Sequence, residues 1–119
     1  EAVTEHITEK EFQRTVIEAF QAHNWKCAHF RAGMTSRIDK QGKPVWVTPV
    51  QADGKGFPDL VCVRERVVYI ELKKQGEKLS PTQEMWRDWL IGAGAEWYCF
   101  RPQDWDAIGK VLGVTDANN

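Results

Sequence analysis

Apolar and polar residues follow two periods along the chain, and these periods divide it into helices and strands. Residues 8–23 begin with a capping box at Thr8 and Glu11 and then place apolar residues at helical spacing. Elsewhere, short apolar or alternating runs are typical of strands. The strands predicted in this way cover residues 25–31, 59–63, 67–73 and 95–101.

Two further helices are predicted after the third strand. Ser80 is placed as an N-cap with Pro81 behind it, and that helix runs to about residue 91. The last helix starts at Pro102. Residues 32–55 are rich in glycine and proline around a short VWV segment, so we predict a long excursion there, with a hairpin as one possible form. The order α-β-(excursion)-β-β-α-β-α is typical of a mixed sheet flanked by helices, an α/β fold.

The length indicates one domain, residues 1–119, with a core at about 8–112 and a frayed tail at 113–119. No apolar run approaches the roughly 18 residues of a membrane helix, and we expect a cytoplasmic protein with no membrane partner. Its three cysteines fall in predicted strands without a zinc-binding spacing, so reduced thiols are expected. The net charge of −1 hides a segregation, because residues 26–78 hold 11 Lys and Arg against 6 Asp and Glu. A basic zone of this kind suits a polyanion but equally suits a solvated surface.

Strand parity places three polar residues together. In the strand 67–73, Glu71 and Lys73 project on the same side, opposite the apolar positions. Asp59 begins the preceding strand and lies beside them if the two strands form a hairpin about Glu65. Two carboxylates at one sheet edge repel each other unless a cation lies between them, and Mg²⁺ prefers oxygen ligands. Separately, a Pro-Asp turn or an E-x-K ion pair is common, but their conjunction favours a nuclease.

Two helical residues are further candidates for the same site. At about 100° per residue, Glu9 falls in the middle of the apolar face of the first helix, which is awkward for packing and sensible for a ligand. Glu11 falls nearly opposite and is already explained by the capping box, so Glu9 is favoured. Gln83 has a simple explanation as the third residue of its own capping box, but it shares a helical stripe with Trp86.

Gly56-Phe57-Pro58-Asp59 with Glu71-Leu72-Lys73 resembles the motif of PD-(D/E)XK nucleases, which have a restriction-endonuclease-like core. The wider pattern resembles the VRR-NUC branch over about residues 8–112, in segments such as TEKEFQRTVIEAF, LSPTQEMW and RPQDW. The resemblance implies that Asp59, Glu71 and the Leu72 backbone carbonyl bind Mg²⁺ or Mn²⁺. It also implies that Lys73 is the catalytic lysine, Glu9 the helix carboxylate and Gln83 a glutamine near the site.

Stand-alone members of that branch are small bacterial and phage proteins. By resemblance we therefore expect a homodimer in the cytoplasm of a bacterial or phage-infected cell. The expected activity is metal-dependent cleavage of branched DNA, such as four-way (Holliday) junctions. Two alternatives are a restriction-like nuclease that recognises a sequence in linear duplex, and a DNA-binding module that keeps the core without cutting.

Candidate DNA contacts are less specific. Lys55, Lys74 and Lys78 are candidates for phosphate contacts, with solvated surface nearly as good an explanation. His29 and Arg31 share a face of their strand and could touch phosphate, although a satisfied strand-edge histidine is the simpler explanation. The sequence holds six tryptophans. Trp86, Trp89 and Trp105 fall on predicted apolar helix faces, so we expect them in the core, with a dimer interface as the alternative.

Overall fold

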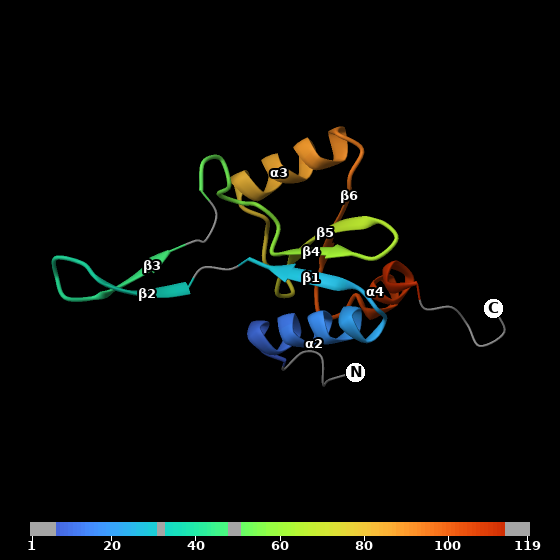
Figure 1. Cartoon of the computed structure of the whole chain (residues 1–119), viewed down its shortest axis with the longest axis horizontal. Coiled ribbons are helices and arrows are strands. Elements are labelled where there is room, and N and C mark those ends of the chain that lie inside the picture. The colour runs from blue at the N-terminus through green and yellow to red at the C-terminus, as the bar shows by residue number, and fades with distance from the viewer. Residues whose placement is uncertain (1–6, 31–32, 48–50, 114–119) are drawn as a thin grey trace.

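The computed structural model describes residues 7–30, 33–47 and 51–113, and these form three helices and six strands (Figure 1). The order agrees with the sequence prediction, and the excursion does contain a hairpin. Boundaries move inward by one to three residues, and the predicted tail lies outside the described residues beyond Gly113. The elements are α2 (Glu9–Ala22), β1 (Lys26–His29), β2 (Gly33–Ile38), β3 (Pro44–Val47), β4 (Leu60–Val63), β5 (Val67–Leu72), α3 (Pro81–Gly92), β6 (Glu96–Phe100) and α4 (Trp105–Leu112).

A mixed four-stranded sheet forms the centre, in the order β1-β4-β5-β6. β1 and β4 are antiparallel, β4 and β5 form an antiparallel hairpin in which Leu60 pairs with Ile70, and β5 and β6 are parallel. The hairpin turns at Arg64-Glu65-Arg66, closed by a bond from the Arg64 N–H to the Arg66 carbonyl. Parallel β5 and β6 need a crossover, which α3 provides. The hairpin about Glu65 that the sequence predicts is therefore confirmed.

Helices cover the two faces of the sheet (Figure 1). α2 and α4 pack on one face, where the ring of Phe12 meets Trp105 edge to face at a centroid distance of 6.1 Å. The indole N–H of Trp25 donates to the Leu112 carbonyl at 3.1 Å and joins the end of α4 to the start of β1. α3 lies on the other face (Figure 1).

Both long helices begin as their sequences predict. The Thr8 hydroxyl accepts from the Glu11 N–H, and the Glu11 carboxylate accepts from the Thr8 N–H, so each satisfies a donor that the first turn leaves unpaired. Ser80 and Gln83 form the same reciprocal pair at α3. Behind its cap, α2 buries Phe12, Val16 and Phe20 against the sheet, and Glu9 at its start is half-buried.

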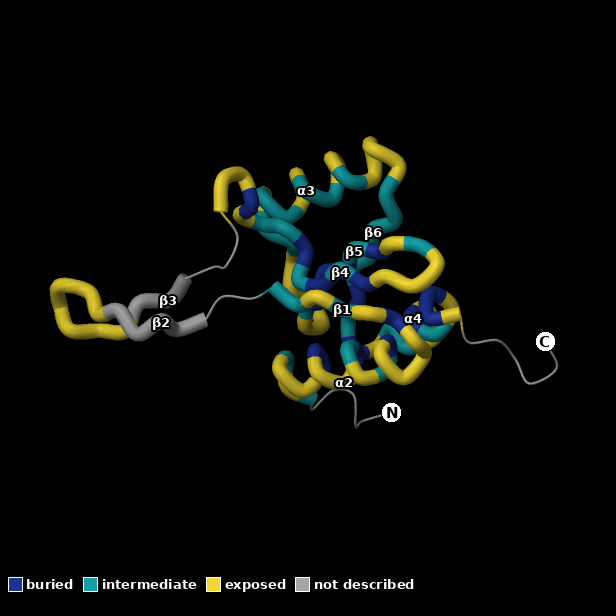
Figure 2. Tube along the Cα trace, viewed as in Figure 1, coloured by how far each residue is buried: buried dark blue, intermediate teal, exposed yellow. Residues whose placement is uncertain are grey.

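Burial differs between the two faces of the sheet (Figure 2). Core residues come from α2, α4 and the facing side of the strands, whereas α3 has no buried residue. The prediction of core tryptophans is wrong for Trp89, which is 50% exposed, and Trp86 is only half-buried. Trp105 is partly buried against the core. An apolar stripe on α3 is real, but little of the chain covers it.

β2 and β3 form a separate two-stranded sheet that projects from the core, called the arm below (residues 33–47; Figure 1). Its tip is held by Asp39, whose carboxylate accepts from the N–H groups of Gln41 and Lys43 at 2.9 Å each. Among the helices of the described residues, none has the length and apolar character to cross a membrane.

Candidate active site

Asp59 is positioned by a loop that requires a glycine. Gly56 has φ of +87°, a left-handed conformation that side chains rarely adopt. A Cβ at this position would lie 2.5 Å from the carbonyl carbon of Thr82 in the first turn of α3. Only glycine lets the loop approach the helix this closely. The buried Pro58 follows and directs the chain toward β4, and Asp59 is the residue immediately before that strand.

Two hydrogen bonds fix Asp59 between its neighbouring strands. Its Oδ2 accepts from the Leu72 N–H at 2.9 Å, at the end of β5. Its backbone carbonyl accepts from the Phe30 N–H at 2.7 Å, directly after β1. Because the carboxylate is bonded to the residue that follows Glu71, the two acidic residues are brought to the same sheet edge.

Glu71 lies in an environment that disfavours its charged form. The residue is 0% exposed, and neither carboxylate oxygen has a hydrogen-bond partner among the described residues. Burial, followed by the negative charge of Asp59, raises its pKa from 4.5 to about 9, and the charge of Lys73 opposes this shift. A buried acid without a partner is costly unless another ligand compensates it.

Lys73 stands at the same edge, one residue beyond β5. Its backbone N–H donates to the Phe100 carbonyl at 3.0 Å, which holds the residue against the end of β6. The side chain is only 11% exposed, and its Nζ lies 3.8 Å from the Glu77 carboxylate. The charge of this ammonium also acts on Glu71, whose pKa it lowers.

Glu9 belongs to α2, which packs on the face of the sheet opposite α3. It lines a pocket of about 180 Å³ together with Phe12, Lys73 and Lys74. In the part of the chain that the structure describes, no group of three or more His, Cys, Asp or Glu is arranged to hold a metal ion. The structure therefore brings Asp59, Glu71 and Lys73 together, and it places Glu9 in the lining of a pocket with Lys73 rather than in a three-carboxylate cluster among the described residues.

The donor set fits a hard divalent cation. Both oxygens of Glu71 lack a partner in the described chain, and the second carboxylate lies beside them. Mg²⁺ takes one or two carboxylates from a protein and keeps several waters, which matches what Asp59 and Glu71 can supply. Such an ion would offset the repulsion that raises the pKa of Glu71.

Comparison with known proteins identifies the family. A family model described as the VRR-NUC domain matches residues 7–102. The chain belongs to the VRR-NUC family. A solved structure titled "VRR_NUC domain" has a similar fold, with a TM-score of 0.58 and 17% sequence identity over 89% of this chain and 95% of that one. A search of curated proteins found no match.

VRR-NUC membership means that the chain carries a nuclease domain, whose substrate is DNA. Among the remaining residues that the sequence predicts for its site, Gln83 is half-buried in the first turn of α3. Its side-chain oxygen accepts from the Ser80 N–H at 2.8 Å, so the capping box uses that oxygen. Leu72 presents its N–H to Asp59, at the strand end where its carbonyl is expected to bind metal.

The predicted DNA contacts of this VRR-NUC domain are mostly surface residues. Lys55, Lys74 and Lys78 are exposed. Lys55 lines a pocket of about 230 Å³ with Trp86 and Trp89 on the α3 side, and Lys74 borders the pocket of Lys73. Arg31 lies outside the described residues.

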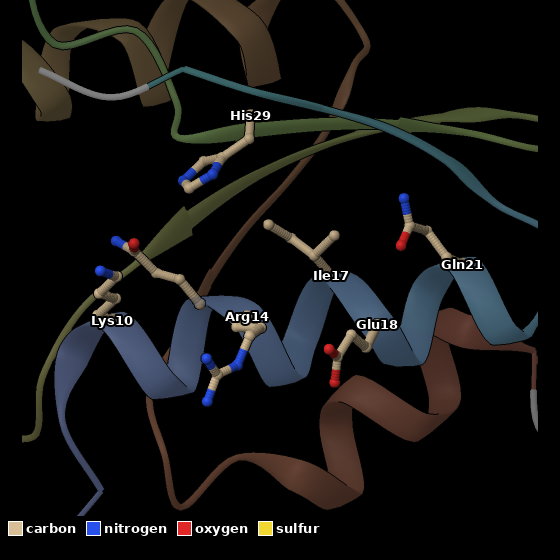
Figure 3. Close-up of a pocket in the computed structure, with 7 residues that line it drawn as sticks. Lys10, Arg14, Ile17, Glu18, Gln21 and His29 are labelled. Carbon is tan, nitrogen blue, oxygen red and sulfur yellow. The ribbon is translucent and has the colours of Figure 1, made fainter. Parts of the chain in front are cut away.

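His29 faces a groove that the sequence alone does not reveal. A pocket of about 340 Å³ lies between β1 and α2, and His29 lines it together with Lys10, Gln13 and Gln21 (Figure 3). Figure 3 shows Arg14 directed away from the strand. Lys10 directly follows Glu9 in α2 and adds a base to the lining of this pocket. In the sequence, the only sign of a role for Lys10 is its place next to Glu9, the predicted ligand.

Proposed function

We propose that this VRR-NUC domain is a Mg²⁺- or Mn²⁺-dependent endonuclease with a PD-(D/E)XK active site, which hydrolyses phosphodiesters in branched DNA. The observation that supports it most is Glu71, a fully buried carboxylate without a partner in the described chain, beside Asp59 and within the influence of Lys73. Membership of the family indicates a nuclease domain. The geometry of Glu71 supports the further proposal that the nuclease uses a metal ion.

Asp59, Glu71 and the Leu72 carbonyl would hold the ion at the end of β5. When bound, the ion polarises a water and offsets charge on the scissile phosphate. Lys73 places an ammonium beside the reacting phosphate and stabilises the charge that develops there. Glu9 lies across the pocket from Lys73 and orients that ammonium or binds a further ion. Gln83 would act from α3 through its amide nitrogen, since the capping box uses its side-chain oxygen.

Selection of branched DNA rests on the surface around the site. The arm lies in the sequence between Phe30 and Asp59, and these two residues are joined by a backbone hydrogen bond. It is therefore rooted beside the catalytic edge, and its exposed Lys40 and Lys43 reach DNA away from the scissile bond. A homodimer with two such sites suits the two-fold symmetry of a four-way junction.

The direct test uses labelled DNA substrates with the purified protein. A four-way junction, a flap and a linear duplex of the same sequence are each incubated with Mg²⁺, with Mn²⁺ and with chelator. We expect cleavage of the junction in either metal, none with chelator and much less cleavage of the duplex. Glu71→Gln should abolish cutting and Lys73→Ala should reduce it about 10²–10³-fold. Lys110→Ala, which changes a remote exposed lysine on α4, should leave cutting unchanged.

Each part of the proposal has its own contrary outcome. Equal cleavage of all three substrates would reject branch selection and leave the nuclease intact. Cuts at one sequence in linear duplex would favour a restriction-like enzyme. A non-cleaving module would be favoured by two results together: the unaltered protein does not cleave the junction, and Glu71→Gln still binds it. Light scattering of protein and junction decides between a homodimer and a monomer.

A further inference from the structure

Two cysteines face each other across adjacent strands, away from the catalytic edge. Cys27 in β1 pairs in register with Cys62 in β4. Their sulfurs are 3.1 Å apart, and both thiols are reduced. A disulfide needs sulfurs about 2.05 Å apart and Cα atoms about 4.4–6.8 Å apart, a range that includes directly opposed residues of antiparallel strands. Closing the pair therefore needs a shift of about an ångström and no change of register.

The two thiols differ in access. Cys62 is completely buried, whereas Cys27 is only partly buried. Cys27 lines a surface pocket of about 580 Å³ together with Gln21, Asn24 and Lys26. The pocket has room for a small reagent at the Cys27 sulfur.

The hydrogen bond between the two thiols also makes their pKa values, and therefore their reactivities, different. The Cys62 thiol donates to the Cys27 sulfur, which lowers the pKa of Cys27 and raises that of Cys62. Because a thiolate is the attacking form in thiol exchange, the accessible sulfur is also the more nucleophilic at neutral pH. Cys27 is thus arranged to react first and Cys62 to react second.

We propose that Cys27 and Cys62 form a dithiol redox site, which a small disulfide such as oxidised glutathione converts into a cross-strand disulfide. The Cys27 thiolate attacks one sulfur of the reagent and expels the first small thiolate. Cys62 then gives up its proton, attacks the Cys27 sulfur and expels the second. Two protein thiols are oxidised to one disulfide, while the small disulfide is reduced to two thiols that take up the protons.

The bond would tie the edge strand to the strand that leads from the catalytic aspartate. Cys62 lies three residues after Asp59, and β1 ends at the residue before Phe30, which donates to Asp59. Oxidation therefore fastens the base of the arm on the sheet. Since the two cysteines are 35 residues apart, the link also restricts the unfolded chain.

The test measures thiols in the folded full-length chain. Protein is incubated with oxidised glutathione, quenched in acid, alkylated after denaturation and weighed intact. We expect two of the three thiols to disappear together with the loss of two hydrogen masses, reversibly on adding dithiothreitol. Tryptic peptides 27–31 and 56–64 should then be linked. Cys99, on the opposite face of the sheet, is the internal control and should stay reduced.

Two variants test the order of attack, with circular dichroism confirming that each is folded. In Cys62→Ala, the glutathione adduct on Cys27 should accumulate because no second thiol resolves it. In Cys27→Ser, the buried Cys62 should stay unmodified. A folded wild-type protein that keeps all three thiols, links Cys99 to either partner or stops at the glutathione adduct overturns the proposal. So does closure that occurs only in denaturing urea.

Discussion

The two faces of the sheet are built for different purposes. On the α2 and α4 face, Phe20, Ile70 and Ile108 are fully buried in one apolar cluster. On the α3 face, the helix has no buried residue, and the fully buried side chain that β5 contributes there is the acid Glu71. One face thus supplies stability, whereas the other gives up apolar packing to hold the acidic side chain of the candidate active site.

Removing one aromatic ring from each face should show the largest difference between them, measured as the loss of unfolding free energy. Phe20→Ala, which empties space under Trp25, should cost about 3–5 kcal/mol of unfolding free energy. Trp89→Ala removes a larger but half-exposed ring from α3 and should cost under about 1 kcal/mol. Urea unfolding followed by circular dichroism gives both values. Similar losses in the two variants would show that α3 is covered in solution, as by a second subunit.

The chemistry of the α3 face should depend on Lys73 without affecting stability. Lys73→Ala removes a side chain whose charge acts at the reacting phosphate, so kcat/KM on a junction should fall about 10²–10³-fold. Its urea midpoint should stay close to that of the unaltered protein, because the ion pair with Glu77 is long and its partner is exposed. Lys110→Ala is the matched control. Undiminished cutting by Lys73→Ala would exclude the proposed mechanism.

Glu71 gives the α3 face a pH dependence that the apolar face lacks. Its pKa in the metal-free folded protein, about 9, lies above its ordinary value of 4.5. The folded state thus holds the proton more tightly, and this stabilisation is complete below pH 4.5 and lost as the pH rises through about 9. Metal-free Glu71→Gln stays neutral and should not lose this contribution. Urea midpoints measured from pH 6 to 9 test the difference.

The same shift links metal uptake to proton release. A protonated Glu71 must ionise to bind Mg²⁺, so at pH 7 binding should release about one proton. Titration calorimetry in two buffers of different ionisation enthalpy counts that proton. Metal binding by the unaltered protein without proton release would contradict a protonated Glu71 at the site.

The smallest difference concerns the two helix caps. Thr8→Ala removes the cap of α2, a helix built into the core, and should lower the unfolding free energy by about 1 kcal/mol. Ser80→Ala removes the equivalent cap from α3, which has no buried residue, so its cost should fall mainly on local opening. Hydrogen exchange should therefore accelerate in α3 more than the urea midpoint falls. A full loss of global stability would show that α3 unfolds only with the core.

Periodicity and local motifs predicted the elements well because their causes are local. Both capping boxes and the hairpin about Glu65 follow from residues close in sequence. Strand parity also placed Asp59 and Glu71 at one edge, since adjacent antiparallel strands align their ends. These parts of the site need no knowledge of distant packing.

What the sequence could not give depends on which surfaces meet. Helical spacing finds the apolar stripe of α3 but not whether anything covers it, so Trp89 was wrongly expected in the core. Facial position made Glu9 a ligand candidate, but the layer from which α2 approaches decides that it reaches Lys73. The contact of Cys27 with Cys62 depends on the register of strands separated by the whole arm.

The hydrogen bond between Phe30 and Asp59 has a consequence for how this protein can change. It holds Phe30 and Asp59, on either side of a long insertion that contains the arm, at the spacing of neighbouring strands. Lengthening such a loop costs little, because closure entropy grows only with the logarithm of its length. Evolution or design can therefore exchange the arm (residues 33–47) for another module, while the Gly56 loop keeps Asp59 and Glu71 at their edge of the sheet.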